Sequence, residues 1–72
     1  MKSDHAHRLT VLAEIADAGS LSKAAERLRL VKSSVSHHIG ELERQIGTKV
    51  LHRHGRRLAL TPIGEILEHV PP

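Results

Sequence analysis

The 72-residue sequence contains no cysteine, phenylalanine, tyrosine or tryptophan. Without cysteine, the chain has neither disulfide bonds nor thiolate metal ligands to support it. Without aromatic residues, its core must be built from leucine, isoleucine, valine and alanine, and a chain of this length makes one small domain. No apolar run approaches membrane-spanning length and the first eight residues are mostly polar. We therefore expect a soluble, cytoplasmic protein.

Positive charge is concentrated in the second half of the chain. The net charge is +3, but residues 32–61 contain six lysines or arginines against two glutamates, a balance of +4, while the remainder sums to −1. A basic half on a small domain is typical of a protein that binds a polyanion. On composition alone, ordinary surface charge is a better interpretation than polyanion binding, so the function must be inferred from sequence motifs.

Apolar residues at helical spacing predict a first helix over about 4–18, which Gly19 ends. Ser20 has the side chain of an N-cap for a second helix, in which the small Ala24 and Ala25 allow a neighbouring helix to pack closely. The apolar positions that define these helices are Leu9, Leu12, Ala13, Ile15 and Ala16 in the first, and Leu21, Ala25 and Leu28 in the second.

A break in this spacing predicts a tight turn in which Arg29 adopts the left-handed conformation that many such turns give to glycine. A third helix then runs to about Ile46 and ends at Gly47. Because Val31 has no side-chain oxygen for a cap, we expect this helix to fray or to begin at Ser33. Its core face contains Val35, Ile39, Leu42 and Ile46, and its opposite face opens with Lys32, Ser33, Ser36, His37 and Gly40.

The segment after the third helix predicts a β-hairpin and a fourth helix. The expected strands are 50–53 and 58–60, around a tip at 54–57 in which Gly55 supplies the positive φ of a tight turn. Thr61 and the proline after it are typical of an N-cap and a first helical position. The apolar face of this fourth helix consists of Ile63, Ile66, Leu67 and Val70.

Two short helices joined by a tight turn, the second exposing donors on its N-terminal half, are typical of a helix-turn-helix, here at 21–40. The donor face can enter the major groove of DNA, where base edges offer hydrogen-bond partners. The basic hairpin would be a wing whose arginine tip lies in the minor groove. The predicted fold is mainly α, a winged helix-turn-helix with a three-helix core, a two-stranded β-wing and the start of a linker helix. The DNA-binding domain is expected at 4–61 and a short linker or dimerisation helix at 62–72.

Four segments in order resemble the N-terminal DNA-binding domain of LysR-type transcriptional regulators: AGSLSKAAERL, SVSHHIGELERQIG, KVLHR and LALTPIG. The resemblance covers about Leu9 to Leu67. It implies a bacterial-type transcription factor that binds double-stranded DNA sequence-specifically, without an effector-binding domain in this chain. It implies no enzyme activity, and we expect no cofactor, no metal, no membrane and no small-molecule ligand.

The family's motifs assign the expected DNA contacts. Its usual Ser-Gln-Pro at the start of the recognition helix corresponds to residues 31–33, and its usual small hydroxyl residue and arginine correspond to Ser36 and His37. The lysine in place of glutamine exchanges a reader of adenine for a cation that suits guanine or phosphate. The expected major-groove contacts are Lys32, Ser33, Ser36 and His37, the minor-groove contacts are Arg56 and Arg57, and the phosphate contacts are Ser20, Ser34, His38, Arg53 and His54.

Several positions depart from the family or leave two interpretations open. Where the family favours phenylalanine this chain has leucine, which predicts modest stability. Arg53 is either a phosphate contact or a member of an internal ion pair, and Glu43 is a surface charge or the partner of an arginine. Gly40 costs about 1 kcal/mol in a helix interior relative to alanine; either the DNA backbone approaches it or it is neutral. The three leucines are Leu12, Leu21 and Leu51.

Two other functions fit parts of the sequence. The fourth helix could pair this chain with a second copy, as a weak homodimer, or with a full-length regulator as a heterodimer, through Ile63, Ile66, Leu67 and Val70. The histidine pairs at 5 and 7 and at 52 and 54 could chelate a metal, but no acidic or cysteine ligand accompanies them, so surface histidines are the better interpretation. Serine and histidine are abundant, yet no carboxylate is placed to orient a catalytic base.

Overall fold

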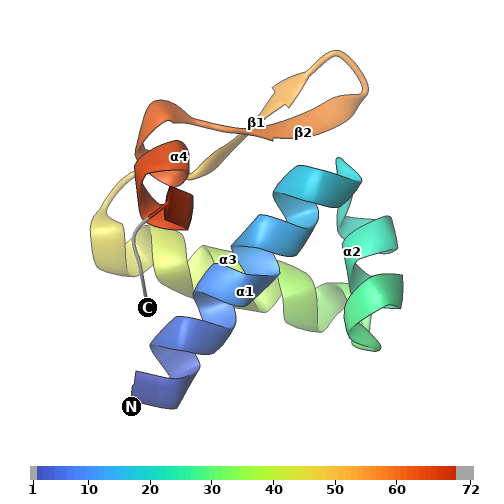
Figure 1. The fold of residues 1–72 in the computed structure, drawn as a ribbon, viewed down its shortest axis with the longest axis horizontal. Helices are drawn as coiled ribbons and strands as arrows, with labels where there is room; N and C mark the ends of the chain where they lie inside the picture. The colour runs from blue at the N-terminus through green and yellow to red at the C-terminus, as the bar shows by residue number, and fades with distance from the viewer. Residues whose placement is uncertain (1, 70–72) are drawn as a thin grey trace.

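The computed structural model describes the backbone of residues 2–69 and the side chains of residues 7–68. Within this part of the chain the structure is mainly helical, with one antiparallel hairpin, and the predicted order of elements is confirmed (Figure 1). The elements are α1 (Lys2–Ala18), α2 (Leu21–Leu28), α3 (Lys32–Ile46), β1 (Leu51–His54), β2 (Arg57–Leu60) and α4 (Pro62–His69).

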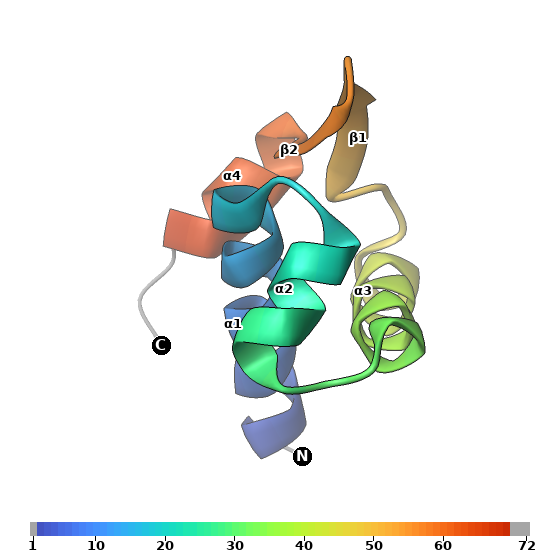
Figure 2. The ribbon, with the colours of Figure 1, turned by 90° about the vertical axis from the view of Figure 1, so that its right-hand side faces the viewer.

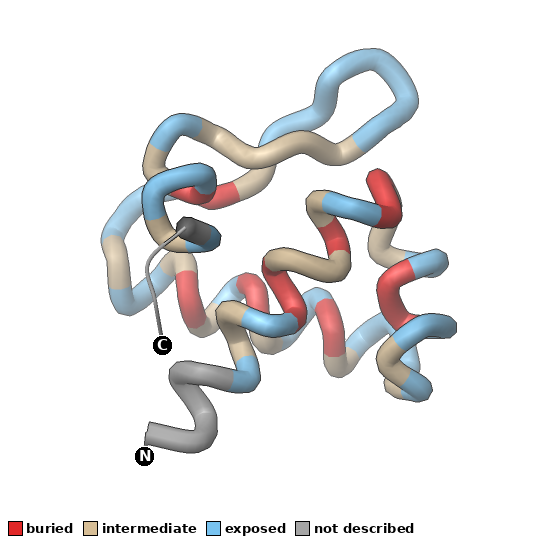
Figure 3. The backbone as a smooth tube through the Cα atoms, viewed as in Figure 1, coloured by how far each residue is buried: buried red, intermediate tan, exposed pale blue. Residues whose placement is uncertain are grey.

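The core lies where α1, α2 and α3 meet, and α1 contributes its largest share (Figure 3). The buried side of α1 carries Val11 and Ala18 besides Leu12 and Ile15, whereas the expected Ala13 and Ala16 are only half-buried. Both sets have helical spacing, and the bulkier valine removes more apolar surface from water. The buried apolar side chains of the described residues are Val11, Leu12, Ile15, Ala18, Ala24, Ala25, Val35, Ile39, Leu42 and Val50.

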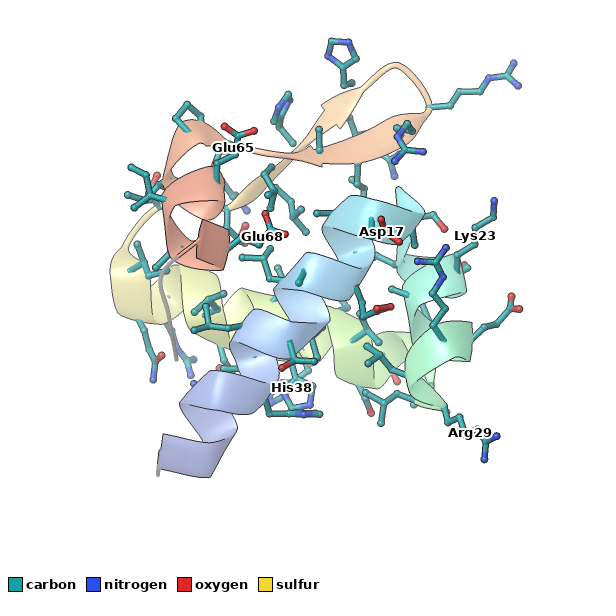
Figure 4. The ribbon with its side chains drawn as sticks, in the orientation of Figure 1. Asp17, Lys23, Arg29, His38, Glu65 and Glu68 are labelled. Atoms are coloured by element: carbon teal, nitrogen blue, oxygen red, sulfur yellow. The ribbon has the colours of Figure 1, made fainter. Side chains whose placement is uncertain are left out.

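The turn between α2 and α3 forms as the sequence predicts. Arg29 has φ 57° and ψ 41°, and its N–H donates to the carbonyl groups of Ala25 and Glu26. At the other end of α2, the Ser20 hydroxyl accepts a hydrogen bond from the Lys23 N–H at 3.1 Å and caps the helix. The Arg29 side chain points away from the domain (Figure 4). The left-handed residue therefore reverses the chain without taking a side chain out of solvent.

The third helix begins at Lys32, one residue before the position expected from the missing cap. Val31 makes no side-chain capping bond, but its carbonyl accepts from the N–H groups of Ser34 and Val35 at 3.0 and 3.3 Å. Backbone bonds alone thus start the helix. Gly47, at φ 86°, ends it as predicted.

Both strands of the hairpin extend one residue further toward the tip than predicted, and the first strand also begins one residue later. His54 pairs with Arg57, so the tip contains only Gly55 and Arg56. Val50, expected in the first strand, lies before it and is fully buried. Its backbone groups are nevertheless paired, because Glu43 accepts its N–H and its carbonyl accepts the N–H of Thr61.

The start of α4 is tied to the loop before β1. The Thr61 hydroxyl donates to the carbonyl of Lys49 at 2.7 Å and accepts from the N–H of Gly64 at 3.2 Å, which confirms the predicted N-cap. A Cβ at Gly64 would lie 2.3 Å from the carbonyl oxygen of Val50. This position therefore requires glycine for close packing.

Viewed from the side, α3 and the hairpin form one edge of the domain, and α1 and α4 lie toward the opposite edge (Figure 2). The contacts of α4 are with α1 and β2. The arrangement is a helix-turn-helix with a two-stranded wing, as expected from the sequence. Among residues 2–69, no helix has the length and apolar character that crossing a membrane requires.

Candidate nucleic-acid interface

The exposed face of α3 carries the predicted donors. Lys32, Ser33, Ser36, His37 and Gly40 are all exposed, while the opposite face of the helix is buried in the core. A groove of about 410 Å³ runs between this helix and the hairpin, and Ser36 and Gly40 lie along it. The helix backbone is thus most accessible on the side that turns toward the wing.

The two glutamates of α3 are both paired with cations. Glu41 forms an ion pair with Arg44 one turn later. Glu43 accepts the N–H of Val50 at 2.9 Å and lies 3.6 Å from the Lys49 ammonium, so its partner is a lysine and not the expected arginine. The N-terminal half of the exposed face therefore presents donors without an unpaired acid.

A basic hollow of about 120 Å³ lies between the first turn of α2, the start of α3 and the hairpin. Lys32, Arg53 and Arg56 line it, and none of the three makes an ion pair with another described residue. The internal ion pair considered for Arg53 is therefore absent from residues 7–68. The remaining lining residues are Gly19, Ser20, Leu21, Ser22 and Leu58. Ser22 and Leu58 were not among the predicted contact residues, because only the tertiary fold brings them to this hollow.

Arg57, expected beside Arg56 in the minor groove, lies over the end of α1. Its guanidinium carbon is 2.6 Å from the place where a Cβ of Gly19 would stand, and its Nη2 is 3.5 Å from the carbonyl oxygen of Asp17. The next N–H, of Leu58, donates to the carbonyl of Gly19 at 2.9 Å. A cation at a helix C-terminus is favourable. These contacts fix the wing to α1, and the minor-groove role of Arg57 stays a prediction.

Two predicted phosphate contacts, Ser34 and His38, are half-buried on the flank of α3 rather than on its exposed face. The His38 ring lies against His7 of α1, with ring centroids 4.7 Å apart in an edge-to-face arrangement (Figure 4). Their phosphate roles stay predictions, but the structure does not bring them together with the basic hollow.

The hairpin histidines share a face, as expected for alternate residues of a strand. The ring centroids of His52 and His54 are 6.3 Å apart, and both side chains are exposed. Among the described residues, no group of three or more His, Cys, Asp or Glu could hold a metal ion. The phosphate contact of His54 stays a prediction.

The predicted dimerisation residues divide into two kinds. Ile63 and Leu67 pack against the core of their own domain, whereas Ile66 is 60% exposed. Val70 lies outside the described residues. Of the predicted seam, the described part therefore offers one large apolar side chain to a partner.

The family model of the bacterial regulatory helix-turn-helix protein, lysR family, matches residues 6–65 of this chain. The HTH-type transcriptional regulator YofA of Bacillus velezensis is 46% identical over 59 residues, which are 82% of this chain and 20% of that protein. The chain thus spans about a fifth of the length of this curated relative.

Two similar solved structures contain DNA. The BenM_DBD/catB site 1 DNA complex has a TM-score of 0.80 and 27% identity, over 86% of this chain and 69% of that chain. The CbnR_DBD–DNA complex has a TM-score of 0.78 and 27% identity, over 86% of this chain and 71% of that chain.

Proposed function

Because this chain belongs to the LysR family of bacterial regulatory helix-turn-helix proteins, we propose that it binds double-stranded DNA sequence-specifically to regulate transcription. One observation carries the proposal: the exposed N-terminal half of α3 presents donors beside a basic hairpin, and its acids are paired. Similarity to two DNA-complex structures supports it.

In the proposed complex, α3 enters the major groove. Ser33, Ser36 and His37 face base edges, because they stand on the exposed side of the helix near its N-terminus, the end that helix-turn-helix proteins direct at bases. The wing lies toward the adjacent minor groove with Arg56 at its tip. Arg57 is proposed to lie beside it toward the same groove, and its contacts with the end of α1 also hold the wing in place.

The relatives are transcriptional regulators, and we infer that this chain has no catalytic role of its own. A function of this kind requires access to the bacterial chromosome, so we propose the cytoplasm as its location. The region 62–72 is proposed as a linker or dimerisation helix that follows a DNA-binding domain at 4–61. Pairing with a full-length regulator through α4 alone is the weaker proposal, because Ile63 and Leu67 already pack against this chain's own core.

The test is selection of bound duplexes from a random pool by the 72-residue chain at near-physiological salt. We expect enrichment of one short motif, with binding to the enriched duplex at least about a thousandfold tighter than to a scrambled duplex. Ser36→Ala should change which base wins at one position, by about 1–3 kcal/mol. Enrichment of no motif, with equal binding to every duplex, would contradict the proposal.

A further inference from the structure

The basic hollow gathers three cations that the sequence assigned to three different parts of DNA. Lys32 was expected at a base edge, Arg53 at a phosphate and Arg56 in the minor groove, yet all three line one concave surface of about 120 Å³. We infer that these three side chains bind a single phosphate group of the duplex backbone. The inference rests on the proposed function, because a duplex is its ligand.

The position of the hollow supports this assignment. It lies between α3, which is proposed to enter the major groove, and the wing, which is proposed to lie toward the adjacent minor groove. One sugar-phosphate strand always separates a major groove from the neighbouring minor groove. A domain that occupies both grooves must straddle that strand, so the backbone passes where the hollow is.

The charges of the hollow are not neutralised inside the domain. The ion pairs among the described residues bind other cations: Glu14 and Asp17 face Arg27, Glu41 faces Arg44, and Glu43 faces Lys49. The lining arginines and lysine therefore repel one another without a counter-charge, and an anion placed among them relieves that repulsion. Phosphate is the anion that arginine recognises best, through paired N–H donors.

The size and the floor of the hollow suit one phosphate. The hollow, of about 120 Å³, has room for one tetrahedral phosphate group. The floor is the first turn of α2, where the Ser20 hydroxyl already accepts the N–H of Lys23. The N–H groups of Leu21 and Ser22, at the start of this turn, have no acceptor within the helix.

The test is a methylphosphonate scan, in which each phosphate of the enriched duplex is replaced singly by an uncharged methylphosphonate. The parent should lose affinity by about tenfold or more at one particular linkage, because hydrogen bonds to charged groups are the strong ones. Lys32→Ala, Arg53→Ala and Arg56→Ala should each bind the unmodified duplex more weakly. The affinity lost on replacing that same phosphate should become smaller in all three variants than in the parent, because each variant removes one of its three contacts.

The matched control is Lys23→Ala, which removes a cation from the first turn of α2 that does not line the hollow. Lys23→Ala should be sensitive to the same methylphosphonate replacements as the parent. Unchanged thermal unfolding of all four variants excludes loss of fold as the cause of weaker binding. Loss of sensitivity at three different linkages, or an altered base preference for Lys32→Ala with the scan unchanged, would overturn the inference. Failure of the proposed function looks different, since the parent would then bind enriched and scrambled duplexes equally.

Discussion

His37 is the residue at which this domain departs most usefully from its family. The family motif has arginine at the corresponding position, and a guanidinium offers five N–H donors and a permanent charge, whereas an imidazole has only two ring nitrogens. His37 is exposed on α3, with the His38 ring centroid 6.1 Å away and the Glu41–Arg44 ion pair on the next turn. A permanent cation at this position should therefore strengthen contact with DNA.

His37→Arg should bind the enriched duplex about tenfold more tightly than the parent, the value of one hydrogen bond to a charged group. His37→Gln, which cannot carry a charge, should bind no more tightly than the parent. Fluorescence anisotropy at fixed salt and pH, with thermal unfolding checked for each variant, is the measurement. Unchanged affinity in both variants would remove His37 from the interface.

At the scale of the elements, replacing a glycine by alanine should have opposite effects on stability in two helices. A Cβ at Gly64 in α4 would lie 2.3 Å from the carbonyl oxygen of Val50, whereas one at Gly40 in α3 would meet nothing within 4 Å. Gly64→Ala should lower the free energy of unfolding by about 1–3 kcal/mol through overpacking. Gly40→Ala should raise it by about 1 kcal/mol through helix propensity.

Urea denaturation of the two variants and the parent measures both effects, and a shift of both variants in one direction would contradict this account. The same Gly40→Ala variant decides what the sequence left open. Reduced DNA affinity in a more stable protein would mean that the DNA backbone approaches this glycine. Unchanged affinity would mean that the glycine is neutral.

The sequence predicted those features of the elements that depend on neighbouring residues. The cap at Thr61, the left-handed Arg29 and the end of α3 at Gly47 each follow from local backbone chemistry, and each is confirmed. The strand bounds of the hairpin differ by one residue from the predicted ones, because they depend on cross-strand pairing such as that of His54 with Arg57 and not on composition.

Contacts between residues far apart in the chain could not be predicted from the sequence, because they too depend on which segments the fold brings together. Arg57 lies over Gly19, and Lys32 shares a hollow with Arg53 and Arg56, only because the folded helices bring these positions together. Periodicity identifies the face of a helix but not what lies opposite it. The donors of α3 could therefore be predicted as a set, whereas the basic hollow and the contacts of Arg57 with the end of α1 could not.

At the scale of the whole molecule, the described part of α4 offers little apolar surface for self-association. Within the described residues α4 runs over Pro62–His69, and two of its apolar side chains, Ile63 and Leu67, already pack inside the domain. Ile66 is then the one large apolar side chain of the described part that a second copy could cover. We expect this 72-residue chain to be a monomer or a weak dimer in free solution, with pairing promoted on a duplex that carries two half-sites about one turn apart. Sedimentation that shows a tight dimer at nanomolar concentration would contradict this expectation.

We propose that α3 and the wing, on one edge of the domain, bind the duplex. An amide NMR titration of the 72-residue chain with its enriched duplex locates the bound surface. We expect the largest shifts in the N-terminal half of α3, at the first turn of α2 and at the hairpin tip, with little change in α4. Shifts centred on α4, or small and uniform shifts throughout the domain, would contradict binding by α3 and the wing.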